Sequence, residues 1–157
     1  VITGDTTAQF DGAIFVPGST VTDFIPSGWR GRKTVVMVGD STGPGQGATG
    51  FYGPWGHSTT ETNVSFVLPY KGVARNLMLD LDSTVGGAAQ TAVGTLRTGE
   101  TTNTALSVSI ASGARQGGPD TDEVEITVGI RASLGFVLSA TAGNRSAHGS
   151  FEFEEIP

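Results

Sequence analysis

Apolar residues recur at every second position along most of the chain from residue 62 onward, and this period restricts the fold more than any other feature of the sequence. A β-strand points successive side chains to opposite faces, so this spacing predicts strands with one buried face. The segment Ala105–Ile110 follows the alternation without a break, and it recurs in segments 64–68, 73–81, 124–130, 134–138 and 151–153. The carboxyl-terminal part of the chain is therefore predicted to consist of strands.

One of these segments interrupts its own pattern. Val73, Leu77, Leu79 and Leu81 share one parity, but Arg75 occupies the same parity with a charged side chain. We expect a single strand here, with the apolar residues on one buried face and Arg75 as the exception.

The first 61 residues have a weaker pattern. Gly12–Val16 and Thr34–Val38 are predicted to be short strands, and the second is almost wholly apolar, so we expect it to be buried on both faces. Phe51, Tyr52 and Trp55 indicate a further strand.

Clusters of turn-forming residues separate the predicted strands, and no segment has the period or the caps of a helix. These clusters lie at Pro69–Gly72, Gly86–Gly87, Gly99–Glu100, Gly117–Asp120 and Gly143–Asn144. About ten strands at such spacing predict an all-β fold, an antiparallel β-sandwich or jelly roll with very little helix. We expect one domain, in which residues 1–24 form an amino-terminal arm and first strand and residues 25–157 form the jelly roll.

Composition excludes several classes of function. The chain has 157 residues and no cysteine, which rules out disulfides, thiol catalysis and cysteine-bound metals. Its net charge is -6, and no basic cluster exceeds Arg30, Arg32 and Lys33, so nucleic-acid binding is not expected. No apolar run approaches the roughly 20 residues of a membrane span. The amino terminus lacks the basic and apolar regions of a signal peptide, so we expect a soluble, mature chain without a membrane partner.

The segment from Val35 to Ser41 resembles the first block of GDSL-type hydrolases, in which a serine after a buried strand is the nucleophile. Such a serine needs a histidine base oriented by a carboxylate. In that family an aspartate stands three residues before the histidine, whereas Arg145 stands three residues before His148, and His57 is the only other histidine. A turn after a strand is therefore the favoured interpretation, and no catalytic residue is predicted.

Other motifs also favour structural interpretations. Gly45–Gly50 fits the dinucleotide pattern G-x-G-x-x-G, but Gly53 and Pro54 would break the helix that this pattern requires. The carboxylates at 80 and 82, at 120 to 123 and at 152 to 155 have no calcium-loop spacing. We therefore predict no cofactor and no metal.

Four aromatic residues in the first half of the chain are candidates for a contact surface. Trp29, Phe51, Tyr52 and Trp55 can form a platform for a sugar, or they can fill a seam between subunits. The seam is the favoured alternative, because large apolar rings more often pack against protein.

From about Thr62 to Ile156 the chain resembles a jelly-roll module of virion proteins from tailed bacteriophages and environmental viruses. That module is itself similar to the trimeric complement and tumour necrosis factor fold. The segments that carry the resemblance are Val73–Leu81, Gly94–Gly99, Thr104–Ile110, Val124–Val128 and Gly135–Ala140.

The resemblance implies a homotrimer without catalytic residues. Modules of this type serve either as fibre tips or as capsid decoration. Because no stalk of repeats or heptads precedes the module in this chain, we expect a capsid decoration, or cement, protein on the outer surface of the virion, with the major capsid protein as partner. Phe10, Ile14 and Phe15 are the candidates for contact with the capsid, because they mix with polar residues outside the module. The alternative is a receptor- or glycan-binding head of a tail fibre, and a GDSL-like serine esterase is the third possibility.

Overall fold

The computed structural model describes residues 8–10, 13–15, 32–41, 43, 47–86, 90–139 and 145–156, and of 8–10 and 13–15 only the backbone. Trp29 lies outside these residues, as do the side chains of Phe10, Ile14 and Phe15. The strands are β1 (Ala8–Phe10), β2 (Ala13–Phe15), β3 (Lys33–Asp40), β4 (Thr49–Gly53), β5 (Gly56–Ser58), β6 (Phe66–Val67), β7 (Gly72–Leu81), β8 (Ala92–Thr98), β9 (Thr102–Ile110), β10 (Gln116–Asp120), β11 (Val124–Ile126), β12 (Arg131–Leu138) and β13 (Ala147–Glu155).

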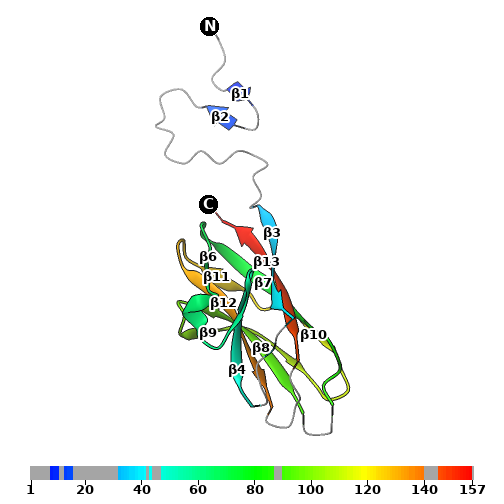
Figure 1. Cartoon of the computed structure of the whole chain (residues 1–157). Helices are drawn as coiled ribbons and strands as arrows, with labels where there is room; N and C mark the ends of the chain where they lie inside the picture. The colour runs from blue at the N-terminus through cyan, green and yellow to red at the C-terminus, as the bar shows by residue number, and fades with distance from the viewer. Residues whose placement is uncertain are drawn as a thin grey trace.

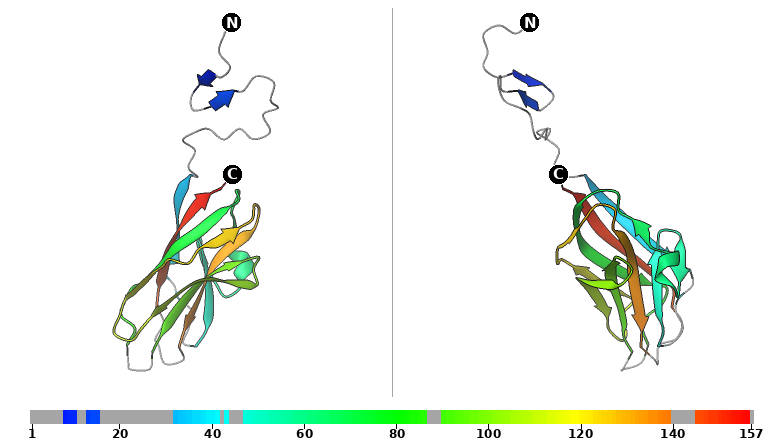
Figure 2. Two further views of the ribbon diagram at one scale, coloured as in Figure 1. Left: turned by 180° about the vertical axis from the view of Figure 1, so that it is seen from behind. Right: turned by 90° about the vertical axis from the view of Figure 1, so that its left-hand side faces the viewer.

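Two antiparallel sheets form a β-sandwich, which confirms the all-β prediction (Figure 1). The five-stranded sheet has the order β10-β7-β13-β3, with β11 also paired to β7, and the six-stranded sheet has the order β5-β4-β12-β8-β9, with β6 also paired to β12. β1 and β2 pair with each other. The two further views in Figure 2 show the large sheets packed face to face. The described residues contain no α-helix, and their one helical turn is the 3-10 helix η1 (Glu61–Asn63).

The core between the sheets consists of the side chains that the period-two pattern selects. β9 and β13 bury alternate residues as predicted, whereas β12 buries five consecutive residues, 132–136. The largest fully buried side chains are Tyr52, Phe136 and Phe151 together with nine leucines and isoleucines. Burial of these side chains is the dominant stabilising contribution, because transfer of apolar surface out of water scales with its area.

A β-bulge in β7 corrects the expectation of one parity. The register against β13 shifts between Ser150 and Glu152, opposite Asn76, which has a left-handed φ of 56°. Before the bulge Ala74 is buried, and after it Leu77 and the leucines that follow are buried. The extra residue moves the side chains to the other parity, so Val73 shares the outward face with Arg75.

β3 is an edge strand, so the prediction that it is buried on both faces is wrong. It pairs with β13 alone among the described strands. Val38 is buried, whereas Val35 and Met37 are 62% and 72% exposed. An apolar run does not by itself distinguish a central strand from an edge strand with one unpartnered face.

Two strand boundaries predicted from the sequence differ from those in the structure. The expected turn at Gly117–Asp120 is part of β10, where Pro119 is tolerated because the strand lies at the edge of the sheet and its register shifts. The expected strand 124–130 ends at Ile126, and Val128 is exposed in the turn that follows.

Candidate interaction surface

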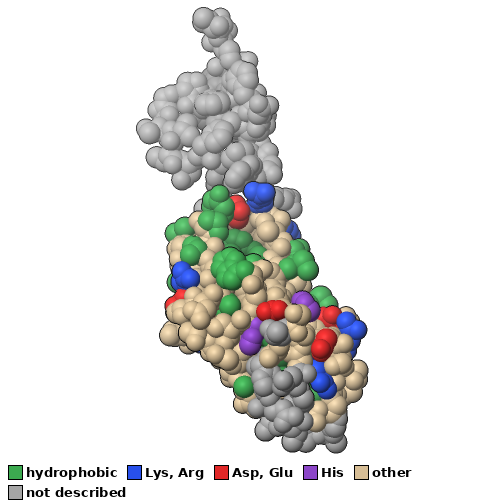
Figure 3. All heavy atoms as spheres, viewed as in Figure 1, with side chains coloured by type: hydrophobic (Ala, Val, Ile, Leu, Met, Phe, Trp, Pro, Cys, Tyr) green, Lys and Arg blue, Asp and Glu red, His purple; other side chains and the backbone are tan. Residues whose placement is uncertain are grey.

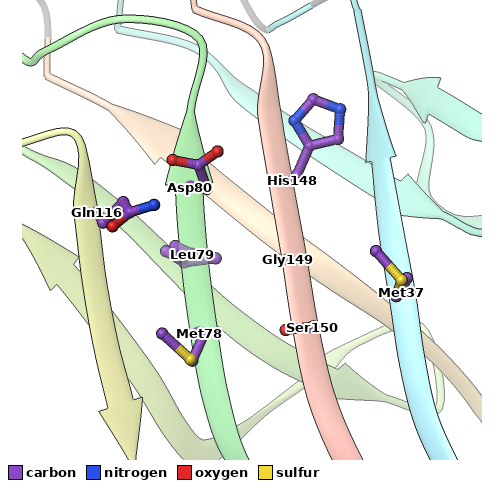
Figure 4. A pocket seen from close by; sticks show the side chains of 8 residues that line it. All are labelled: Met37, Met78, Leu79, Asp80, Gln116, His148, Gly149 and Ser150. Carbon is purple, nitrogen blue, oxygen red and sulfur yellow. The ribbon is translucent and has the colours of Figure 1, made fainter.

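The outward face of the five-stranded sheet carries a row of three side chains from three strands. The register sets Met37 of β3 opposite Ser150 of β13, and Ser150 opposite Met78 of β7. Met37 is 72% exposed and Met78 is 44% exposed. Because Ser150 is small, the two methionine side chains stand on either side of a low point in the row (Figure 4).

A second row crosses the same face one pleat away. Here the register sets His148 of β13 opposite Asp80 of β7, and Asp80 opposite Gln116 of β10. Arg115 donates two hydrogen bonds to the Asp80 carboxylate, at 3.1 and 3.2 Å. These hydrogen bonds keep the pKa of Asp80 below its ordinary value, so the carboxylate is charged at neutral pH.

The two rows enclose an open groove of about 340 Å³, which we call the methionine groove. Its lining residues are Met37, Met78, Leu79, Asp80, Gln116, His148, Gly149 and Ser150. The floor of the groove is the backbone of Leu79 and Gly149. The Leu79 side chain is buried in the core, and a Cβ added at Gly149 would also point inward, since it would lie 2.5 Å from Leu134 Cδ2. The groove therefore has apolar walls and a polar rim, which is the usual character of a recognition site.

Beyond the groove, toward the carboxyl end of β13, the same face is charged. Arg75 forms ion pairs with Glu123, Glu152 and Glu154, and Lys33 lies 3.7 Å from Glu154. These groups compensate one another on the surface. Among the described residues of this face, the exposed large apolar side chains are Met37 and Met78 of the groove and Val35 beside it.

The predicted aromatic residues do not form one platform. Tyr52 is fully buried and packs edge-on against Phe136, with ring centroids 6.0 Å apart. The guanidinium of Arg97 lies over the Phe51 ring at 5.3 Å. Trp55 alone among the three is strongly exposed, at 64%.

Trp55 lies in the turn between β4 and β5, which we call the aromatic turn (Gly53–Gly56). Its ring packs edge-on against the buried Phe66, with centroids 6.5 Å apart and planes at 83°. This contact restricts the ring while one side stays in solvent. Figure 3 shows hydrophobic side chains over the upper half of the described surface, with both histidines below them.

A buried carboxylate holds the segment after the aromatic turn on the six-stranded sheet. Glu61 accepts hydrogen bonds from Arg97 Nε at 3.0 Å and from Ser133 Oγ at 2.6 Å. Beside it, Glu100 accepts from Ser65 Oγ and pairs with Arg131, both at 2.6 Å. No sequence pattern indicates this network, because its members are far apart in the chain and belong to no motif.

The residues of the hydrolase-like block lie at the end of β3. The hydroxyl of Ser41 donates to the Asp40 carboxylate at 3.2 Å, and neither histidine accepts from it. The other carboxylate oxygen of Asp40 accepts from the backbone N–H of His57 at 3.1 Å. Burial raises the pKa of the nearby Tyr52 hydroxyl, and the charges of Asp40 and Asp82 raise it further.

No group of three or more His, Cys, Asp or Glu residues able to hold a metal occurs in the part of the chain that the structure describes. None of the described helices is long and apolar enough to span a membrane. No protein-family model, curated protein or solved structure matches the chain. The surfaces and the strand order of the chain are therefore the features that bear on its function.

Proposed function

We propose that this chain is a capsid decoration protein, a homotrimer of jelly-roll subunits that binds the outer surface of a tailed-phage capsid. The strand order carries the proposal. The first long strand pairs with the last (β3 with β13), the second with the last but one (β4 with β12), then β7 with β10, and β8 with β9. A hairpin of such nested pairs, rolled into two sheets, is a jelly roll, which is the fold of the virion modules that the sequence resembles.

Exposed apolar side chains support self-association. Val35, Met37 and Met78 are 62%, 72% and 44% exposed on the outward face of the five-stranded sheet, and Trp55 is 64% exposed on the aromatic turn. Contiguous exposed apolar surface is typical of protein interfaces, since its contact with water is unfavourable. Three copies around an axis can cover the exposed apolar side chains, because in a closed ring every subunit contacts a neighbour on both sides.

The proposed activity is mechanical. A protein that binds the assembled lattice better than the free capsid subunits stabilises the lattice by mass action. No bond has to be broken for this effect, and the hydrogen bond from Ser41 to Asp40 is consistent with a serine that has no activating base. The major capsid protein is the proposed partner.

Two measurements test the proposal. Sedimentation equilibrium at micromolar concentration should give three times the 16.1 kDa chain mass. Antibodies against the chain should then label the shell of virions from the virus that encodes it, at regular lattice points in electron micrographs. A monomer in the first measurement, or label confined to tail tips in the second, would contradict it.

The exposure of Trp55 on a turn favours one rival, a glycan-binding head of a tail fibre, since exposed indole rings bind the faces of sugars. A glycan array separates the two proposals. Specific binding that Trp55→Ala abolishes would support the rival, and absence of binding would support the capsid role.

A further inference from the structure

We infer that the methionine groove of one copy receives Trp55 from the aromatic turn of the next copy. This inference rests on the homotrimer proposed above and specifies its contact. The two surfaces are different, so the contact is heterologous, and each copy contributes its groove to one neighbour and its tryptophan to the other.

The groove has the chemistry to hold an indole. Its volume of about 340 Å³ lies near the lower end of the range for ligand pockets, which suits one large side chain. Met37 and Met78 line it, and methionine sulfur makes favourable contacts with aromatic rings while its flexible side chain adapts to their shape. Figure 4 shows these two side chains flanking Ser150, with Asp80 and Gln116 toward the other end of the groove.

Trp55 has the complementary chemistry. Its side chain is 64% exposed and is held edge-on by Phe66, so insertion costs little conformational entropy. Within the part of the chain that the structure describes, the indole N–H donates no hydrogen bond. The groove offers acceptors at its rim, the Asp80 carboxylate and the Ser150 hydroxyl. A buried indole N–H requires such a partner.

Charge favours this partner for the groove. The carboxylates at and beside the groove, Asp80 and Glu152, are already paired with Arg115 and Arg75, so the groove presents no uncompensated charge to a partner. Residues 41–60, which include the aromatic turn, contain no Asp, Glu, Lys or Arg and form the longest stretch without them. An uncharged turn therefore matches a groove whose neighbouring charges are already compensated.

The positions of the two surfaces fit a small ring. Met37 projects from the outward face of the edge strand β3, and Asp40 of the same strand accepts a hydrogen bond from His57 of β5. The β4–β5 hairpin that carries Trp55 thus lies beside the β3 edge, and the groove and the turn occupy adjacent sides of the subunit. In a three-membered ring, the directions from a subunit to its two neighbours form an acute angle, as surfaces on adjacent sides do.

Cross-linking tests the contact directly, because the chain has no cysteine. Pro54→Cys places a thiol beside Trp55, and Gln116→Cys places one on the groove rim; both positions are exposed. With a short bismaleimide, we expect covalent dimers when the two single variants are mixed and covalent trimers from the double variant. Neither single variant alone should cross-link. Cross-linking within a single variant, or none in the mixture, would overturn the inference.

Sedimentation equilibrium, which measures the mass in solution, tests how much each side of the contact contributes to trimer stability. A central aromatic contact typically contributes about 2 kcal/mol or more, so Trp55→Ala should weaken assembly about 30-fold or more. Met78→Glu, on the groove side, should weaken it similarly, because it introduces a charge among apolar contacts. Tyr70→Ala is the matched control, since Tyr70 is also an exposed aromatic residue but lies outside the groove and the turn, and it should leave the mass unchanged. Circular dichroism and urea midpoints verify folding of each variant.

The outcomes separate this inference from the proposed function. A wild-type monomer at micromolar concentration overturns both the trimer and the contact. A trimer that folded Trp55→Ala and Met78→Glu leave intact overturns the contact alone. If both variants dissociate the trimer but wild-type trimers do not label capsids, the contact stands and the decoration role fails.

Discussion

Arg97 donates its Nε–H to the carboxylate of Glu61 across 3.0 Å, although the two residues are 36 positions apart in the sequence. Glu61 is only 7% exposed, so the contact is a buried ion pair. Ser133 supplies a second hydrogen bond to the same oxygen. The pair fastens η1, and with it the chain that follows the aromatic turn, to the outward face of the six-stranded sheet.

Glu61→Ala should lower the free energy of unfolding by about 3 kcal/mol, because it leaves the Arg97 guanidinium partly buried without its partner. Urea denaturation measures this loss. Glu125→Ala is the control: it removes a surface ion pair to Lys71 at 2.7 Å and should cost about 1 kcal/mol or less. Equal losses of unfolding free energy in the two variants would show that burial of the Glu61–Arg97 pair does not contribute to stability.

Asn76→Val should destabilise the fold by about 1 to 2 kcal/mol, since a β-branched residue is strained at a φ of 56°. Asn76→Gly, which accepts this φ freely, should change stability by about 0.5 kcal/mol or less. Thermal unfolding of the two variants provides the comparison. If Asn76→Val unfolds at the same temperature as the wild type, β7 does not require the bulge.

Arg115→Gln should raise the pKa of Asp80 toward its ordinary value of 3.8, because the hydrogen bonds from Arg115 are the main cause of the lowered pKa. A carboxyl group whose pKa is lowered in the folded state stabilises that state above its unfolded pKa. The stability difference between wild type and variant should therefore be present at neutral pH. It should disappear as the pH falls through the lowered pKa of wild-type Asp80. NMR titration of the Asp80 carboxyl carbon, with urea midpoints at several pH values, checks both statements, and an unchanged titration would contradict them.

Deleting Val1 to Gln9 should abolish binding to capsids while the trimer remains folded. The first strand of the proposed jelly roll is β3 (Lys33–Asp40), so this deletion leaves the jelly roll complete. Co-sedimentation with capsids that lack the protein measures binding, and sedimentation equilibrium verifies the trimer. Retained capsid binding would exclude residues 1–9 from the proposed contact and leave Phe10, Ile14 and Phe15 as its candidates.

The candidate surface was only partly predictable. Trp55 was among the predicted contact residues, but its companion Tyr52 is buried and Phe51 lies beneath Arg97. The methionine groove was not predicted at all. Met37 lies in an apolar run that suggested a central strand, and Met78 lies in a strand whose parity changes at the bulge. No local pattern reveals that the two methionines meet across β13.

By itself, the sequence determined the β-class and most of the core, because the alternation of apolar and polar residues depends only on the geometry of a single strand. Leu106, Phe136 and Phe151 are buried for this reason. Tertiary structure alone decided which strand lies at an edge, where β7 bulges and which side chains share the outward face. These properties depend on pairing between distant strands, which no local period encodes. The groove, the buried Glu61 and the exposed position of β3 all follow from that pairing.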